Sequence, residues 1–429
     1  MSGTERYPRV LIVSHNAFSM TNNMGKTLVS YFSSFPKSCL AQLYLHEGVP
    51  HSNICSNYYS FSDKDALKSV IIRSRKGTVY QDQTFDEAAS SVITGKLYTA
   101  GKTKNPVVSF ARDIVWKLSN WKNKSLINWV REFNPDLIFF ASGDYVFAYK
   151  IAMRLSELFD VPLATCCFDD FYSYCSYKKR FLGGSYYRKF MKVATETIKR
   201  SKWLFVVNDL MAEEYSKMFG KDCTILYTSA GINTDVTGYS GKQRNICYIG
   251  GLALNRQVPV CEIGRLLKGK IEGLPDHVDV YSAENREEVL QVLTMENGID
   301  YHGPIAPAEV QEKIKNSLAV IHVESFDENN RQRTRLSLST KIAESLSSGT
   351  VLIAYGPLEL ASMQYLIKND VAIVSDDLND LKKKMEDILN DERKYTAIVN
   401  RAMELAKKNH GKDTAAGKLL QAFADTGDA

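Results

Sequence analysis

Short apolar runs alternate with amphipathic segments along almost the whole chain. In the first half, the runs that predict strands are Arg9–Ser14, Leu40–Leu45, Asp136–Ala141, Pro162–Cys167, Trp203–Val207 and Thr224–Tyr227. Helices are expected to begin near Gly25–Thr27 and to cover about Val146 to Leu158. Continuous apolar strands with helices between them are typical of a parallel sheet whose two faces are both covered. The first half is therefore predicted to be an α/β domain.

A stretch rich in Gly, Ser and Thr, residues 228–243, separates this domain from a second one. Beyond it the pattern starts again, with strands expected at Asn245–Ile249, His277–Tyr281, Ala319–Val323, Val351–Tyr355 and Val371–Val374, and with helices near Val258–Leu267, Arg286–Glu296, Pro307–Asn316, Thr340–Ser348, Leu378–Asn390 and 392–424. Two successive doubly wound units predict two Rossmann-like domains that face a cleft. We place them at residues 1–235 and 236–429, with the last helix free to pack back on the first domain.

The composition is that of an ordinary folded protein, with 44% hydrophobic and 24% charged residues in a chain of 429. A net charge of +5 is modest for this length and argues against a dedicated nucleic-acid binder. The eight cysteines form no Cys-x-x-Cys pair, so we expect reduced, buried thiols and no disulfide framework or zinc site. The start of the chain lacks a signal-peptide core, and no apolar run reaches the roughly 18 residues that span a bilayer. We therefore expect a cytoplasmic protein.

Basic residues gather in two stretches that also carry aromatic residues. Between Lys96 and Lys124 seven basic residues meet one acid, Asp113, and between Lys178 and Lys202 nine basic residues meet only Glu196. Such a surface suits the anionic headgroups of a membrane, where the protein would bind peripherally. A solvated helix face explains the same pattern equally well. Both interpretations stay open on the sequence.

The most informative segment runs from Ser339 to Pro357. It predicts a short helix that begins after a hydroxyl cap, ends at Gly349 and leads directly into a buried strand. Lys341 and Glu344 are three residues apart, so they share one face near the start of this helix. Backbone N–H groups and the helix dipole favour an anion there. A lysine and an acid at this place suit a nucleotide, the lysine for the phosphates and the acid for the ribose hydroxyls.

The second half resembles the nucleotide-sugar-binding domain of family 4 of the retaining glycosyltransferases with the GT-B fold. The segments that carry the resemblance are Tyr248–Arg256, His322–Phe326 and Ser339–Pro357, and the first half agrees more loosely through Ser14–Asn16 with Gly25–Thr27, Ala111–Ile114 and Asn134–Asp136. The resemblance implies transfer of a sugar from a nucleoside-diphosphate sugar with retention of configuration, the donor lying on the second domain and the acceptor on the first. Many members of the family assemble surface polysaccharides on lipid-linked acceptors at the inner membrane face. Metal is not usually required.

Arg256 and Lys341 are the predicted partners of the donor diphosphate. Arg256 follows Gly250 and Gly251 after a predicted strand, where glycines let a ligand approach the backbone closely. A guanidinium can bind a diphosphate through two hydrogen bonds, although a surface arginine after a loop has the same pattern. The family often carries a lysine about six residues later, where this chain has Cys261-Glu262. Lys341 is therefore expected to supply the second cation.

Glu344 is expected to accept hydrogen bonds from the ribose hydroxyls. Most family members carry another Glu eight positions upstream, at the place of Leu336 in this chain. Glu324 follows the predicted strand 319–323 and is a candidate replacement, its alternative being an N-cap or a loop salt bridge. We also assign Gly356, near the end of the motif, to the nucleotide-binding positions.

In the first half the candidate site residues are Gly25, Asp144 and Asp170. Gly25 would let the donor approach the first strand–helix loop, whereas a P-loop is excluded because Met20 stands where its first glycine belongs. Asp144 and Asp170 follow predicted strands and are candidates for binding acceptor hydroxyls or moving the released proton, although Asp also caps helices routinely. His322, inside a predicted strand, is expected to be structural.

We therefore predict a retaining GT-B glycosyltransferase of surface-polysaccharide or glycolipid assembly that needs no cofactor and no metal. Arg256, Lys341, Glu324, Asp144 and Asp170 are its predicted catalytic residues. Its partners would be a nucleotide-sugar donor and a glycan or lipid-linked acceptor, and not nucleic acid. Two other functions fit the same scaffold: a nucleotide-sugar epimerase, and a non-catalytic member that binds a nucleotide sugar or another transferase.

Overall fold

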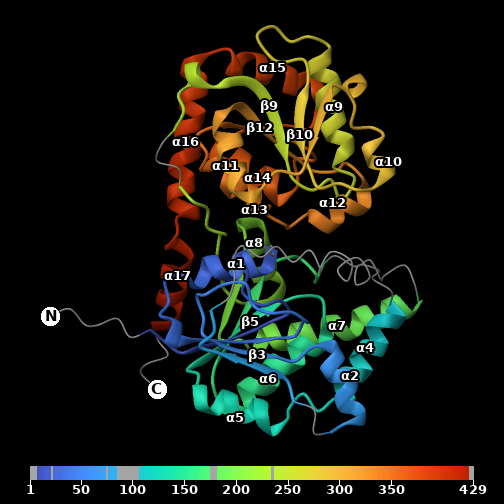
Figure 1. The fold of residues 1–429 in the computed structure, drawn as a ribbon, viewed down its shortest axis with the longest axis vertical. Coiled ribbons are helices and arrows are strands. Elements are labelled where there is room, and N and C mark those ends of the chain that lie inside the picture. The colour runs from blue at the N-terminus through green and yellow to red at the C-terminus, as the bar shows by residue number, and fades with distance from the viewer. Residues whose placement is uncertain are drawn as a thin grey trace, which may run out of the picture. The chain divides into compact units, whose positions relative to one another are not determined.

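The structure is a computed structural model that describes residues 7–20, 23–73, 76–84, 106–173, 181–232 and 236–424. The chain divides into two compact units, which Figure 1 shows in colours that follow the chain. Unit 1 comprises Met1–Val207, Met211–Leu226 and Ala415–Ala429, and unit 2 comprises Asn208–Leu210 and Tyr227–Thr414. Residues 233–235, at the predicted domain boundary, lie outside the described residues.

Unit 1 contains an eight-stranded sheet in the order β4-β3-β2-β1-β5-β6-β7-β8. Its strands are β1 (Val10–Ser14), β2 (Leu40–Tyr44), β3 (Asn57–Ser60), β4 (Thr78–Gln81), β5 (Leu137–Ser142), β6 (Leu163–Cys167), β7 (Trp203–Val206) and β8 (Cys223–Ile225). The β3–β4 pair is antiparallel and the other pairs are parallel. The strand order reverses direction at β1, which pairs with both β2 and β5. Open α/β sheets bind ligands beyond the carboxyl ends of their strands at such a point.

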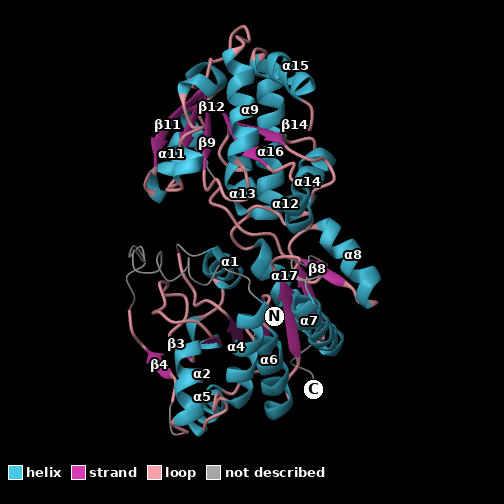
Figure 2. Ribbon diagram, turned by 90° about the vertical axis from the view of Figure 1, so that its right-hand side faces the viewer, coloured by secondary structure: helices cyan, strands magenta, loops and turns pink. Residues whose placement is uncertain are grey.

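Alternate residues of β1 explain its continuous apolar sequence. Leu11 and Val13 belong to one hydrophobic cluster, and Val10 and Ile12 belong to another. Because successive side chains of a strand point to opposite faces, both faces of this sheet are buried. Helices surround the strands in each unit (Figure 2). Those of unit 1 are α1 (Asn23–Phe32), α2 (Asp63–Ile71), α4 (Pro106–Leu118), α5 (Lys124–Phe133), α6 (Val146–Phe159), α7 (Phe181–Arg200) and, for the most part, α8 (Asp209–Phe219).

The last helix, α17 (Thr414–Phe423), packs on unit 1. Leu419 and Phe423 belong to the same buried cluster as Val10 and Ile12. Lys418 Nζ also donates a hydrogen bond of 2.8 Å to the Ile225 carbonyl of β8. The chain therefore returns to its first unit at its end.

Unit 2 contains a six-stranded sheet in the order β11-β10-β9-β12-β13-β14 with every pair parallel. Its strands are β9 (Gln243–Ile249), β10 (Val278–Tyr281), β11 (Ile299–Gly303), β12 (Ser317–Val323), β13 (Val351–Tyr355) and β14 (Ile373–Ser375). Its helices are α9 (Gln257–Lys268), α10 (Glu287–Leu290), α11 (Pro307–Asn316), α12 (Glu328–Thr334), α13 (Thr340–Leu346), α14 (Ala361–Asn369), α15 (Leu378–Leu389) and α16 (Glu392–His410). The strand order again reverses, now at β9, so the carboxyl ends of β9 and β12 border a second switch point.

The predicted α/β class with two parallel-sheet, Rossmann-like units is confirmed. Several elements differ from the prediction. The prediction lacks three strands, β3, β4 and β11, because their short, partly polar sequences contain no continuous apolar run. The predicted helix at 286–296 is only Glu287–Leu290. The polar segment that follows β12, for which the sequence predicts no helix, forms α12. The predicted helical region 392–424 consists of two helices, α16 and α17.

Part of the basic, aromatic surface proposed from the sequence lies outside the described residues: Lys96, Lys102, Lys104, Lys178, Lys179 and Arg180. Cys175 lies outside them as well, and the other seven cysteines are free thiols. Among the helices that the structure describes, none has the length and apolar character needed to cross a membrane.

Candidate functional site

A buried ion pair joins the carboxyl ends of β9 and β12 in unit 2. Arg256 lies directly before α9, and Glu324 directly follows β12. Arg256 Nη2 donates to both carboxylate oxygens of Glu324, at 3.1 and 3.0 Å. Glu324 is only 4% exposed, and His322 Nε2 lies 3.4 Å from its Oε1. Burial alone would raise the pKa of Glu324, but the contacts with His322 and Arg256 outweigh burial and hold that pKa below its usual value.

The loop between β9 and α9 turns sharply before Arg256. Leu254 and Asn255 have φ angles of 63° and 59°, the left-handed region that residues other than glycine seldom occupy. Asn330 Nδ2 of α12 donates to the Leu254 carbonyl at 3.1 Å and so supports this turn. Backbone strain of this kind persists only where neighbouring structure enforces it. Here the turn places the arginine at the end of the sheet.

Lys341, in the first turn of α13, reaches the start of the same loop. Its Nζ lies 5.7 Å from the centre of the Tyr248 ring, and a Cβ built on Gly250 would lie 1.4 Å from that Nζ. The side chain of Lys341 as a whole is exposed, but protein groups crowd its ammonium and, together with the positive charge of Arg256, lower its pKa to about 8. The negative charges of Glu344 and Glu324 raise the pKa of Lys341 and so offset part of this lowering. Because the two positive charges repel each other, an anionic ligand near both of them would relieve this repulsion.

The remaining predicted nucleotide-binding residues of unit 2 surround these cations. Glu344 lies on α13 with Lys341 and is partly buried. Gly251 accepts a hydrogen bond of 2.8 Å from the Tyr248 hydroxyl through its carbonyl. A Cβ on Gly356 would lie 3.0 Å from the Cβ of Glu324, so this glycine makes room for the buried acid.

Leu336 occupies the place that the resemblance assigns to an upstream Glu. Its side chain is fully buried, and its carbonyl accepts a hydrogen bond of 2.7 Å from Asn208 Nδ2. No ligand-binding carboxylate is therefore available at this position. Glu324, the acid that follows β12, forms an ion pair with Arg256 in this structure.

A cavity of about 320 Å³ adjoins the ion pair and was not anticipated from the sequence. Its lining combines aromatic rings, carboxylates and the start of α9: Asn255, Val258, Pro259, Glu262, Ser325, Phe326, Asp327, Tyr355 and Asp376. Glu262 stands near the place where the resemblance leads us to expect a second cation. Burial raises the pKa of the Tyr355 hydroxyl, and the nearby Glu262 carboxylate raises it further. The side of the site next to Glu262 is therefore acidic, and only the side next to Lys341 is basic.

The candidates of unit 1 lie at its own strand ends. Asp170, after β6, is 4% exposed and accepts hydrogen bonds from the Tyr215 hydroxyl at 2.9 Å and from the Ser173 N–H at 2.8 Å, which gives it a structural role in this loop. Asp144 follows β5 and is partly buried. A Cβ on Gly25 would lie 2.6 Å from the Ala17 carbonyl oxygen, so close packing alone accounts for this glycine.

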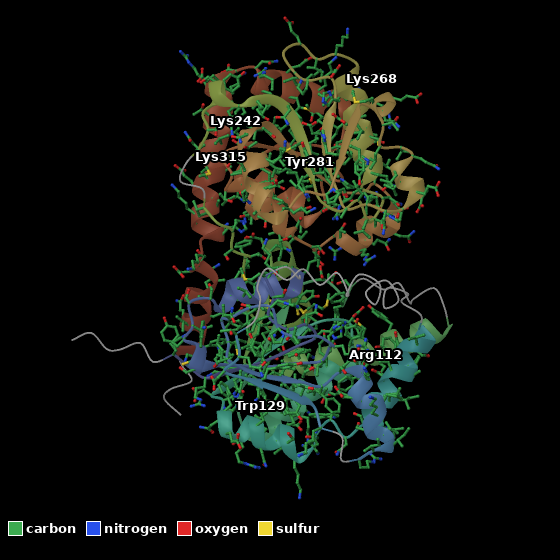
Figure 3. All side chains as sticks on the ribbon, viewed as in Figure 1. Arg112, Trp129, Lys242, Lys268, Tyr281 and Lys315 are labelled. Atoms are coloured by element: carbon green, nitrogen blue, oxygen red, sulfur yellow. The ribbon has the colours of Figure 1, made fainter. Side chains whose placement is uncertain are left out.

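Sequence reasoning missed a cluster around His15, which follows β1. Its ring centre lies 4.7 Å from that of Tyr145 and 5.1 Å from that of His46, and Arg112 of α4, labelled in Figure 3, lies 4.1 Å over the Tyr145 ring. Burial lowers the pKa of His15 well below its usual value, and the charges of Arg112 and His46 lower it further. The imidazole is thus neutral at the switch point of the sheet. His15 and Arg112 lie in segments that the resemblance already includes, but only the fold brings them together with Tyr145 and His46.

Comparisons with known proteins agree with this architecture. Residues 264–421 match the model of a family described as "Glycosyl transferase-like". No curated protein matches the chain. Similar solved structures include HepE of Anabaena in complex with UDP, with a TM-score of 0.62, 12% identity and coverage of 97% of this chain and 100% of that one.

Two further solved structures share the fold at similarly low sequence identity. TarM has a TM-score of 0.60 at 8% identity, with 97% of this chain and 99% of that chain covered. The α,α-trehalose 6-phosphate synthase of Burkholderia multivorans has a TM-score of 0.57 at 10% identity, with 98% of each chain covered. The chain therefore has the GT-B fold, and most of its unit 2 is similar to the glycosyltransferase-like family.

Proposed function

We propose that this chain is a retaining glycosyltransferase that moves a sugar from a nucleoside-diphosphate sugar to a glycan or lipid-linked acceptor in surface polysaccharide assembly. The observation that carries the proposal is the convergence of Arg256 and Lys341 on the Gly250 loop at the end of β9. This convergence occurs in a fold that solved structures share with UDP and UDP-glucose bound.

The two cations would stabilise the departing diphosphate, since charge develops on its oxygens as the bond to the sugar breaks. An anion next to Lys341 favours the protonated amine and so raises its lowered pKa again. Arg256 shares its guanidinium with Glu324 in the free protein and still has its Nε buried without a hydrogen-bond partner. Protein cations in these positions supply the charge that a metal ion supplies in other transferases.

The ribose would be held by Glu344, one turn along α13 from Lys341. The acceptor hydroxyl would attack on the face from which the diphosphate leaves, which gives retention of configuration. On unit 1, Asp144 and the neutral His15 are the groups at strand ends that would bind an acceptor hydroxyl or take up its proton. Peripheral association with an anionic membrane through the basic residues of α4 and α7 belongs to the same proposal.

Incubation of the protein with a radiolabelled nucleotide-sugar panel and a lipid extract tests the proposal. Label that moves to the lipid or glycan fraction with an unchanged anomeric configuration supports it. Recovery of an epimerised donor would assign the scaffold to an epimerase, and binding without turnover would assign it to a non-catalytic member. Either of the last two results overturns the proposed activity.

A further inference from the structure

Two histidines and two aspartates share one face of neighbouring strands in unit 2. His277 precedes β10 and Asp279 lies within it, while Asp300 and His302 lie in β11. The strands are parallel, and Asp279 stands opposite Asp300. Because side chains two residues apart on a strand point to the same face, the sequences His277-Val278-Asp279 and Asp300-Tyr301-His302 bring four metal-ligating side chains together.

The distances suit a single ion. One ligand atom from each of His277, Asp279 and Asp300 lies within 4.8 Å of the other two. His277 Nε2 is 3.8 Å from Asp279 Oδ1, and His302 Nε2 is 2.9 Å from that same oxygen and 3.5 Å from Asp300 Oδ2. Around a tetrahedral zinc ion with bonds of about 2.0–2.1 Å, neighbouring ligand atoms lie roughly 3.3 Å apart. His302 Nε2 donates to Asp279 Oδ1 in the metal-free protein, so a bound ion would replace that hydrogen and draw the four side chains together.

Outer contacts already orient two of the ligands. His277 Nδ1 lies 2.7 Å from Asp276 Oδ1, and since an ionised carboxylate only accepts, Nδ1 carries the hydrogen and Nε2 is left to bind metal. A carboxylate on the far ring nitrogen is the usual outer partner of a metal-binding histidine. Asn245 Nδ2 donates to Asp279 Oδ2 at 2.6 Å, which turns Oδ1 toward the histidines. This arrangement goes beyond a chance group of acids.

The ring of His302 is also fixed. It stacks on Tyr281, labelled in Figure 3, with ring centres 4.7 Å apart and an angle of 12° between the planes. The side chain of Asp279 is 12% exposed and that of Asp300 is 47% exposed. An ion can therefore reach the cluster from solvent and meet one well-buried carboxylate.

We propose that His277, Asp279, Asp300 and His302 bind one divalent transition-metal ion of the zinc type. Imidazole and carboxylate ligands together suit zinc and its neighbours in the periodic table, whereas magnesium and calcium prefer oxygen ligands alone. The ion would join β10 to β11, which is the outermost strand at this edge of the sheet. The site stabilises unit 2 and takes no part in the metal-free donor chemistry proposed for Arg256 and Lys341.

The sequence shows no local metal-ligand motif here because each strand supplies only two ligands. The pairs become one cluster only when β10 and β11 lie side by side, and β11 is a strand that the apolar pattern does not predict. The prediction that sugar transfer needs no metal concerns the site of Arg256 and Lys341, not this cluster.

Titration of the untagged full-length protein with zinc chloride, after treatment with a chelator, tests the site by isothermal calorimetry. Wild type is expected to bind one ion per chain, and zinc is expected to raise its melting temperature because a ligand of the native state stabilises that state. His277→Gln and Asp300→Asn should each weaken binding by at least about tenfold. His51→Gln, in unit 1, removes a histidine outside the cluster and should bind zinc as wild type does.

Two results overturn the inference. One is a wild-type protein that binds no zinc. The other is wild-type affinity in both His277→Gln and Asp300→Asn, which would assign the bound ion to other groups such as the free cysteines. Both replaced side chains are partly exposed, so both variants are expected to fold, and a melting curve of each without metal verifies this.

Discussion

The ammonium of Lys341 occupies the space that a side chain on Gly250 would need, with only 1.4 Å between Nζ and the ideal Cβ position. Gly250 also has a φ of 152°, a conformation that other residues rarely adopt. The glycine is therefore required for the lysine to reach the loop before Arg256. Gly238, elsewhere in unit 2, has open space around its Cβ position and a φ of -65°, so it offers a comparison outside the predicted site.

Gly250→Ala is expected to weaken binding of UDP by about tenfold or more, because the new methyl group displaces Lys341 from the site. Gly238→Ala should leave the affinity within about twofold of wild type. Calorimetric titration of both variants measures the difference. Equal affinities for the two would show that the position of Lys341 does not matter for the nucleotide.

Arg256→Ala is expected to destabilise unit 2 by about 3–5 kcal/mol, because it leaves the charge of Glu324 buried without its partner. Adding Glu324→Gln should restore part of this loss, since the amide removes the buried charge. Arg331→Ala is the control: Arg331 pairs with Glu359 in a partly exposed position, so its removal should cost less than about 1 kcal/mol. Urea unfolding compares these three variants with wild type. A loss in Arg256→Ala no larger than in Arg331→Ala contradicts the buried pair.

Binding of UDP is expected to weaken as the pH rises above about 8, the pKa of Lys341 in the free protein. The diphosphate prefers the protonated amine and raises its pKa, so the free protein loses the proton first and affinity falls as the pH increases. A decrease of about tenfold is expected between pH 7.5 and 9.5. In Lys341→Arg the charge persists across this range, and the affinity should stay nearly constant. A wild-type profile as flat as that of the arginine variant is the contrary outcome.

A second lysine of low pKa, Lys242, is expected to make stability depend on pH. Its Nζ donates to the carbonyls of Lys315 and Gly349, at 2.5 and 2.9 Å, and to Thr350 Oγ1 at 2.9 Å; Figure 3 labels Lys242 and Lys315. Burial lowers the pKa of Lys242 to about 8 from 10.5, and the charge of Lys315 adds to the effect.

Between these two pKa values the unfolded chain holds more protons than the folded one, so the contribution of Lys242 to stability grows as the pH rises. The difference in unfolding free energy between wild type and Lys242→Met should therefore increase from pH 8 to 10.5, by about 3 kcal/mol at most. Urea unfolding at several pH values measures it. A difference that stays constant with pH would mean that Lys242 titrates as an ordinary exposed lysine.

The sequence predicted most of what depends on local pattern. Strands such as β1, β5 and β13 are buried on both faces and therefore read as continuous apolar runs. The edge strands β4 and β11 face solvent in part, so their mixed sequences resemble loops. The Ser339–Pro357 motif identified α13 and β13 because an amphipathic turn and Gly349 follow one another directly in the chain. The predicted hydroxyl cap is not formed, since the Ser339 side chain makes no cap hydrogen bond.

The site could be predicted only as far as each residue belongs to a motif. Arg256, Lys341 and Glu344 follow from strand, glycine and helix signals. The pairing of Arg256 with Glu324, the contacts of His15 with Tyr145, and the four ligands on β10 and β11 involve residues far apart in sequence. Such contacts depend on which strands are neighbours, and no periodicity of the chain encodes that order.

The most direct test of the account is calorimetric titration of wild type, Lys341→Ala, Glu344→Ala and Lys268→Ala with nucleoside diphosphates and nucleotide sugars. Lys268 is an exposed lysine at the end of α9 and serves as the control. The account predicts that wild type and Lys268→Ala bind at least one of these nucleotides alike, and that Lys341→Ala and Glu344→Ala bind it at least about tenfold more weakly. If no nucleotide binds, or if all four proteins bind with equal affinity, unit 2 does not hold an activated sugar in the way described.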